Sequence, residues 1–260
     1  VAVFSLIPDK DFSEKYEGFD LSSNVGVTSS TKTYSEYLAD FKDAKNPSVT
    51  VDVDIFNFDK SKSYGTRIEK DYHGKDVVFT EDRSSVTWSV DVKEAGFCNI
   101  SMEYIATPSR NVTMEREVSI NGKVPFSGAD ILSFYRLWRD GGEIKYDNQG
   151  NSIRPSQVEF FDFQTVRFKS DLGYETEPYR FYFNAGLNEI TFKSTNEPMG
   201  ISSFQLVPVL TYDTYEQYLA KQPSKPESYT KTDVLIKVQG ENAVSRSDPS
   251  LFARYDRSSA

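Results

Sequence analysis

One stretch of this 260-residue chain collects most of the side chains whose types and spacing could bind a ligand. Residues 131–155 read ILSFYRLWRDGGEIKYDNQGNSIRP and interleave aromatic rings with charged and amide groups: Tyr135, Trp138, Arg139, Tyr146, Asp147 and Asn151. An aromatic face packs well against the apolar face of a sugar ring, and a few fixed polar groups can satisfy its hydroxyls. Because the stretch is long and interrupted by glycines, we predict a loop excursion that carries a saccharide site.

The same stretch also has a structural interpretation. Phe134, Leu137 and Trp138 lie at helical spacing, and in this alternative they plug the edge of the fold. Tyr174, in DLGYETEPY, is a further candidate ligand contact, and an exposed surface tyrosine without a ligand is its alternative.

Other reactive side chains are few. Cys98 is the only cysteine and His73 the only histidine, which excludes an internal disulfide, a cysteine-based zinc site and a multi-histidine metal centre. Alternation around Cys98 predicts a buried thiol, and DYHGKD predicts that His73 lies in a polar turn. Many carboxylates could form the acid and base pair of a glycosidase, but their spacing selects no two of them, and no nucleophile motif or glycine-rich phosphate loop is present.

The overall charge limits the classes of molecule that the chain is expected to bind. A formal net charge of -9 repels phosphate backbones and anionic membranes, so we expect neither a nucleic-acid partner nor insertion into a membrane. No run of about 18 apolar residues is present, and the opening VAVFSLIPDKD is too short and too soon interrupted to be a signal peptide.

The elements that must position these side chains are mostly strands. Apolar and polar residues alternate with a period of two in segments separated by turn signals such as Glu94-Ala95-Gly96 and Asn121-Gly122. We predict strands at 49–55, 77–80, 86–92, 97–106, 118–120, 158–168, 179–184, 187–193 and 201–209. Many short strands with almost no helix predict an all-β sandwich.

Two similar heptads, TYSEYLA at 33–39 and TYEQYLA at 214–220, predict short amphipathic helices. Thr33 with Glu36, and Thr214 with Gln217, have the spacing of a capping box. Each heptad precedes a proline-containing break and an alternating strand, which is 234–238 in the second case. We therefore predict a lead-in or linker at 1–32, a sandwich module at 33–212, and at 213–260 a linker helix with the first strand of a second, incomplete module.

Several strings resemble a known family. VTWSVDVKEAGFCNISMEYIA (86–106), VSINGKVPF (118–126), FYFNAGLNEITFK (181–193) and ISSFQLVPV (201–209) resemble, in order, the galactose-binding-domain-like sandwiches of carbohydrate-binding module families 6 and 35. YSEYLA, VPFSGADILSFYRLW, DNQGNSIRPSQVE and ENAVSRSDPSLFARYDRSS are similar to modules attached to extracellular solute-binding proteins of bacterial ABC transporters.

The resemblance implies a jelly-roll sandwich that acts as a noncatalytic, carbohydrate-binding-like module of an exported bacterial sugar-uptake protein. Its partners would be an oligosaccharide or polysaccharide and the remaining domains of a longer chain. A structural spacer or protein-interaction module without sugar binding is the main alternative, and a glycoside-active enzyme fragment is another.

The same resemblance bears on calcium. Family 6 and 35 modules commonly hold calcium between acidic residues of the first strand and an Asp of the last. Asp52 and Asp54 could supply the first pair, and carboxylate oxygens suit calcium. The last strand, Ile201-Ser202-Ser203-Phe204-Gln205, lacks the Asp, so solvated carboxylates on a strand face are the alternative.

Overall fold

The computed structural model describes residues 31–222, 236–240 and 243–251, and most of its elements are antiparallel strands. The predicted strands correspond to β1 (Val51–Val53), β3 (Lys75–Val92), β4 (Gly96–Ala106), β5 (Met114–Ile120), β10 (Gln157–Phe160), β11 (Gln164–Arg167), β12 (Phe181–Phe183), β13 (Gly186–Asn196) and β14 (Met199–Pro208). Two predicted strands merge in β3, and the predicted strand at 158–168 is divided into β10 and β11.

Five further strands escaped the alternation pattern. They are β2 (Tyr64–Tyr72), β6 (Leu132–Phe134), β7 (Leu137–Asp140), β8 (Lys145–Tyr146) and β9 (Ser152–Ile153). β2 buries none of its residues fully, so its sequence does not need to alternate. The helical spacing of Phe134, Leu137 and Trp138 was misleading, because these residues belong to β6 and β7.

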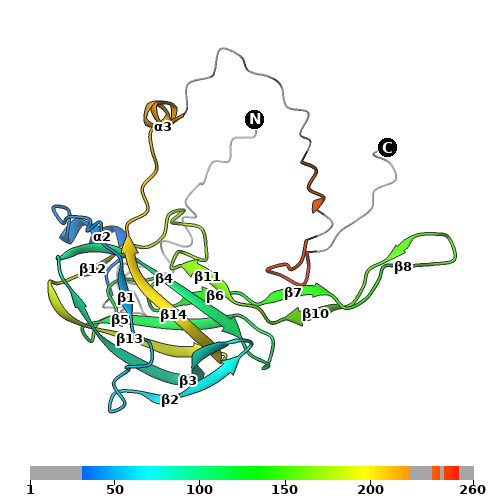
Figure 1. The fold of residues 1–260 in the computed structure, drawn as a ribbon, viewed down its shortest axis with the longest axis horizontal. Helices are drawn as coiled ribbons and strands as arrows, with labels where there is room; N and C mark the ends of the chain where they lie inside the picture. Colours follow the sequence, from blue (N-terminus) through cyan, green and yellow to red (C-terminus); the bar gives the residue numbers. More distant parts are fainter. Residues whose placement is uncertain (1–30, 223–235, 241–242, 252–260) are drawn as a thin grey trace, which may run out of the picture.

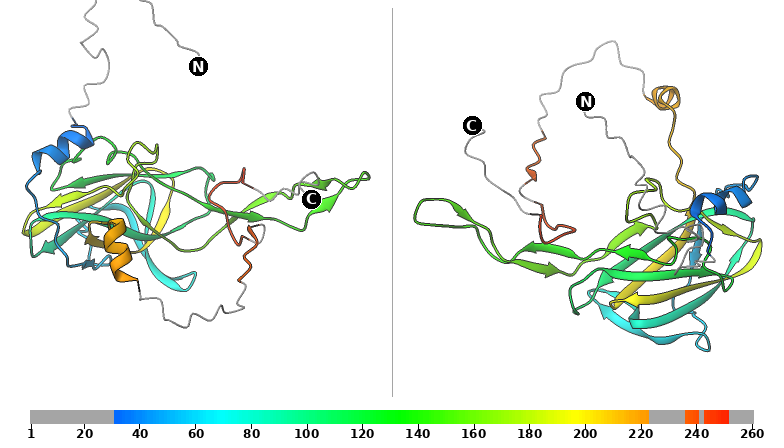
Figure 2. Two further views of the ribbon diagram at one scale, coloured as in Figure 1. Left: turned by 90° about the horizontal axis from the view of Figure 1, so that it is seen from above. Right: turned by 180° about the vertical axis from the view of Figure 1, so that it is seen from behind.

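The main sheet has the order β11-β4-β14-β3-β13-β5-β6, with β1 beside β14, β12 beside β4 and β2 beside β3. The 18-residue strand β3 pairs with β14 near Val78 and with β13 from Ser85 to Val92. It therefore passes from one half of the sheet to the other, and the sheet curls over itself (Figures 1 and 2). The fold is the all-β sandwich that the sequence predicts.

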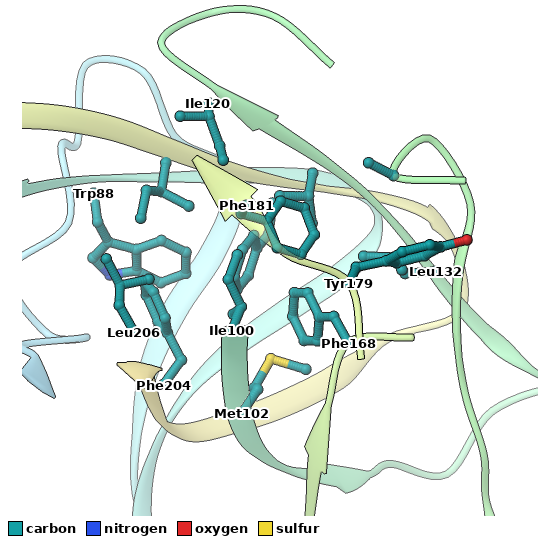
Figure 3. Close-up of a cluster of buried hydrophobic side chains, with 14 of the residues drawn as sticks. Trp88, Ile100, Met102, Ile120, Leu132, Phe168, Tyr179, Phe181, Phe204 and Leu206 are labelled. Atoms are coloured by element: carbon teal, nitrogen blue, oxygen red, sulfur yellow. The ribbon is translucent and has the colours of Figure 1, made fainter. Parts of the chain in front are cut away.

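The core lies between the two halves. Trp88 of β3 is fully buried, and its ring centroid is 4.9 Å from that of Phe204 in β14 and 5.2 Å from that of Phe192 in β13 (Figure 3). The indole N–H donates to the carbonyl of Ile55 at 2.8 Å, so the polar atom of this large side chain is satisfied. Cys98 is buried as predicted, and burial raises the pKa of its thiol to about 11, which disfavours the nucleophilic thiolate at neutral pH.

Both heptads form capped helices, α2 (Tyr34–Asp40) and α3 (Tyr215–Lys221), and both predicted capping boxes are present. α2 has seven residues, and Tyr37 packs into the core. None of the residues of α3 is buried, and Figure 1 shows α3 away from the sandwich.

The structure describes only part of the two chain ends for which elements are predicted. Residues 1–30 of the predicted lead-in and residues 234 and 235 of the predicted strand 234–238 lie outside the described residues. Residues 236–238 are described and are not in a strand.

β7 and β10 pair along Leu137–Asp140 and continue into the β8–β9 pair. We call residues 137–160 the arm. The arm projects from the sandwich in all views (Figures 1 and 2), and nearly all side chains from 141 to 154 are exposed. No helix in the described part of the chain has the length and apolar character needed to cross a membrane.

Candidate functional site

The predicted ligand contacts are spread over the arm and its surroundings. Tyr135 lies just before the arm, with 40% of its surface exposed, and its hydroxyl donates to Asp171. Tyr174 lies in the same loop as Asp171, between β11 and β12, and is 84% exposed. This tyrosine is therefore accessible, but its ring has no described partner that would fix a platform.

Trp138 and Arg139 follow one another in β7. Trp138 faces Glu159 across the β7–β10 pair and is half-buried, outside the buried core cluster to which Phe134 belongs. The plugging role predicted as an alternative is therefore wrong for Trp138 and right for Phe134. The guanidinium of Arg139 lies 4.9 Å from the centre of the Phe160 ring, a cation–π contact that stiffens the arm.

At the tip of the arm, Asp147 and Asn151 bind each other. One carboxylate oxygen of Asp147 accepts the N–H of Gln149 at 2.9 Å and that of Asn151 at 2.7 Å, and the other accepts the Asn151 amide at 2.9 Å. The Asn151 side chain and backbone donors hold the pKa of Asp147 below its ordinary value. Both residues form the β8–β9 turn, while the neighbouring Tyr146 is 66% exposed.

The structure thus brings Asp147 to Asn151, but it does not gather the predicted contacts in one place. Their binding role stays a prediction.

The two candidate calcium ligands are engaged elsewhere. Asp52 accepts the Gln205 amide at 2.6 Å, and Asp54 accepts the N–H of Phe56 at 3.1 Å. Gln205 of the last strand, where the resemblance implies an Asp ligand, instead donates its amide N–H to Asp52. Within the described residues no group of three or more His, Cys, Asp or Glu side chains could hold a metal ion. These residues do not fit a calcium site, and we derive no role for calcium.

Sequence reasoning missed a cavity of about 820 Å³ beside α2, which we call the α2 recess. It is lined by residues from three separate parts of the chain: Thr31, Lys32, Tyr37, Asp40, Phe41, Ile120, Asn121, Lys123, Val124, Pro125, Tyr182 and Asn184.

The aromatic wall of the α2 recess is held rigidly. The rings of Phe41 and Tyr182 are stacked, with centroids 4.1 Å apart and an interplanar angle of 17°. The hydroxyl of Tyr37 accepts the backbone N–H of Tyr182 at 2.7 Å and so fixes β12 to α2. Desolvation of Tyr37 raises the pKa of its hydroxyl well above the ordinary value, so this group stays neutral.

The polar wall depends on an Asn-Gly turn. Asn121 and Gly122 both have positive φ, 52° and 76°, as a two-residue hairpin turn of type I′ requires. The Asn121 amide donates to the buried Asn188 at 3.1 Å and accepts the N–H of Glu189 at 2.8 Å. This fixed turn places the exposed side chain of Lys123 at the recess.

The rim of the α2 recess carries charges of both signs. Lys32 forms an ion pair with Asp40 at 2.5 Å, and the exposed Asn184 lies on the β12 side. An aromatic surface next to amine, amide and carboxylate groups can bind a ring that has one apolar face and several hydroxyls.

The chain is thus an all-β sandwich with an aromatic recess at one end and a projecting arm. It is similar to the crystal structure of a GH26-CBM35 β-(1,4)-mannanase from Podospora anserina, with 15% identity and a TM-score of 0.38 over 64% of this chain and 29% of the mannanase chain. It is also similar to a family 35 carbohydrate-binding module from Clostridium thermocellum, with 11% identity and a TM-score of 0.32 over 61% of this chain and 98% of the module.

The C-terminal family 6 module of a Zobellia galactanivorans laminarinase gives 16% identity and a TM-score of 0.30 over 61% of this chain and 99% of that module. No family model and no curated protein matches the chain.

Proposed function

We propose that this chain is a noncatalytic carbohydrate-binding module whose α2 recess binds a saccharide. The observation that carries the proposal is the combination of a fixed Phe41–Tyr182 wall with exposed amine and amide groups. The cavity of about 820 Å³ lies in the range of small-molecule sites, roughly 300–1,000 Å³.

In this proposal a sugar ring lies with its C–H face against the aromatic wall, and its hydroxyls bind the side chains of Lys123 and Asn184. The partly buried hydrogen bonds of Asn121 and Tyr37 hold both walls in place before the ligand arrives, which lowers the entropy cost of binding.

We further propose that the module belongs to an exported bacterial sugar-uptake protein with a solute-binding domain, because of the sequence resemblance described above. The test is the gene itself: a solute-binding domain is expected in the same reading frame. A reading frame that encodes this segment without a solute-binding domain would contradict the proposal.

Saccharide binding is tested by calorimetry, after a screen of plant and host oligosaccharides has supplied a ligand. We expect the double variant Lys123→Ala/Asn184→Ala to lose roughly tenfold or more in affinity, since each hydrogen bond to a charged or polar partner contributes about 0.5–3 kcal/mol. Lys145→Ala, an exposed lysine on the arm, is the matched control.

Trp138→Ala separates the recess from the arm. If Trp138→Ala abolishes binding and the double variant does not, the arm is the saccharide site and the assignment to the α2 recess is wrong. Release of reducing sugar from a polysaccharide by the wild-type chain would contradict the noncatalytic assignment.

A spacer or protein-interaction module is the second candidate. It is favoured by the arm, which offers β-strand edges away from the sandwich and already pairs with another segment of the chain. Binding to no member of the screen would favour this candidate.

A further inference from the structure

The arm is paired with a segment distant in sequence. We call residues 243–251 the tail segment. The backbone N–H of Trp138 donates to the carbonyl of Arg246 at 2.7 Å, and the N–H of Arg246 donates to the carbonyl of Trp138 at 2.8 Å. This reciprocal pair is a single antiparallel bridge at the edge of β7, the hydrogen-bond pattern by which a chain segment docks on a strand edge. The tail segment lies beside β7 in both overall figures (Figures 1 and 2).

The side chain of Arg246 makes the contact specific. Its two terminal nitrogens donate to the two carboxylate oxygens of Asp140 at 2.9 and 2.8 Å, and one of them also donates to Gln157 at 3.0 Å. Only 10% of the Arg246 side chain is exposed. A planar guanidinium matches this fork of acceptors, whereas a lysine ammonium could meet only part of it.

The two side chains that accept from Arg246 are also held by contacts within the arm. Asp140 and Gln157 are direct partners in the β7–β10 register, and the Gln157 amide donates to Asp140 at 2.5 Å. A second contact further along the tail segment joins Arg154 of the arm to the carbonyl of Pro249. The arm therefore contacts both the backbone of the tail segment and the side chain of Arg246.

We propose that the arm is an intramolecular docking site for the tail segment, with Arg246 as its anchor. The docking holds residues 243–251 on the arm instead of at the sandwich end where β14 finishes. This role goes beyond saccharide binding, since it uses no residue of the α2 recess.

Hydrogen exchange of the full chain, followed by mass spectrometry, tests the proposal. In the wild type, amides 244–247 exchange more slowly than in a free peptide of the same sequence. Arg246→Ala removes a charge-assisted, bidentate contact, so exchange there rises roughly tenfold or more. Arg246→Lys gives an intermediate rate, while Lys145→Ala, an exposed lysine on the same arm, leaves the rate unchanged.

A charge reversal distinguishes docking from local misfolding. Asp140→Arg and Arg246→Asp each release the tail segment, and the double variant restores slow exchange, because the ion pair is then rebuilt with opposite polarity. Tryptophan emission gives a parallel readout: Trp88 is fully buried and the half-buried Trp138 is the only other tryptophan, so release shifts the emission to longer wavelength.

Three results would overturn the proposal. The first is that wild-type amides 244–247 exchange at the rate of the free peptide. The second is that Arg246→Ala leaves their exchange rate unchanged, and the third is that their protection from exchange increases with protein concentration. The last result would assign the docked segment to a second copy of the chain.

Discussion

A buried ionic network at the base of the arm makes a strong prediction for stability. Arg136 lies between β6 and β7 with 2% of its side chain exposed, and the carboxylate of Glu197 is fully buried. They are joined at 2.7 Å. We predict that Arg136→Met, which keeps most of the volume but removes the charge, lowers the free energy of unfolding substantially.

The magnitude follows from the contacts of Arg136. Each of its N–H groups has an acceptor: the carbonyls of Val112 and Thr107 at 2.8 and 2.9 Å, the Ser109 hydroxyl at 2.5 Å, and the carboxylates of Glu159 and Glu197. Breaking a buried ion pair by removing one partner costs about 3–5 kcal/mol, because the other charge stays buried. At about 2–4 °C per kcal/mol for a domain of this size, that loss lowers the melting temperature by roughly 6–20 °C.

The assay is urea denaturation at pH 7, followed by circular dichroism and tryptophan emission. Arg110 supplies the matched control, because its guanidinium binds the same Glu197 carboxylate at 2.6 Å while 64% of its side chain is exposed. Arg110→Met should therefore cost much less than Arg136→Met. Equal losses in the two variants would refute the reasoning that burial sets the cost.

The remaining predictions concern pH, backbone geometry and the two helices. Burial acts to raise the pKa of Glu197, but hydrogen bonds and nearby arginines hold this pKa below its ordinary value. The contribution of Glu197 to the free energy of unfolding is therefore present above about pH 4–5 and is lost as the pH falls. Glu197→Gln should flatten the acid limb of a stability-versus-pH curve. Gly96→Ala should cost about 1–3 kcal/mol in thermal unfolding, since the new Cβ would lie 2.3 Å from the carbonyl oxygen of Lys45, and an unchanged melting temperature would contradict this. Tyr37→Phe should cost about 1–3 kcal/mol, because the partly buried backbone N–H of Tyr182 loses its acceptor. Tyr218→Phe, at the matching position of α3, should leave the free energy of unfolding unchanged.

The sequence predicted the sandwich well because most of its strands bury at least one face. Trp88 alternates with Val86 and Val90, and all three are buried. The alternation fails for β2 and for the arm, whose side chains are mostly exposed and therefore need no apolar period. Local signals predicted the Asn121-Gly122 turn and both capping boxes correctly, since these depend on neighbouring residues alone.

The candidate site was harder to predict. Asp147 and Asn151 have the residue types of ligand contacts, but they form the hairpin turn, which the DNQGN string could have indicated. The α2 recess combines Phe41, Lys123 and Tyr182, which are far apart in sequence and meet only when α2 packs against β12. No local pattern marks such a surface.

The helices formed by the two heptads differ in whether they unfold together with the sandwich. Tyr34 and Tyr37 of α2 accept backbone N–H groups of residues 180 and 182, so α2 should unfold in the same cooperative transition as the sandwich. α3 buries no residue, and a seven-residue helix has little stability of its own. Calorimetry of the chain should therefore show one sandwich transition to which α3 contributes no enthalpy, and a module connected through α3 would melt as an independent unit.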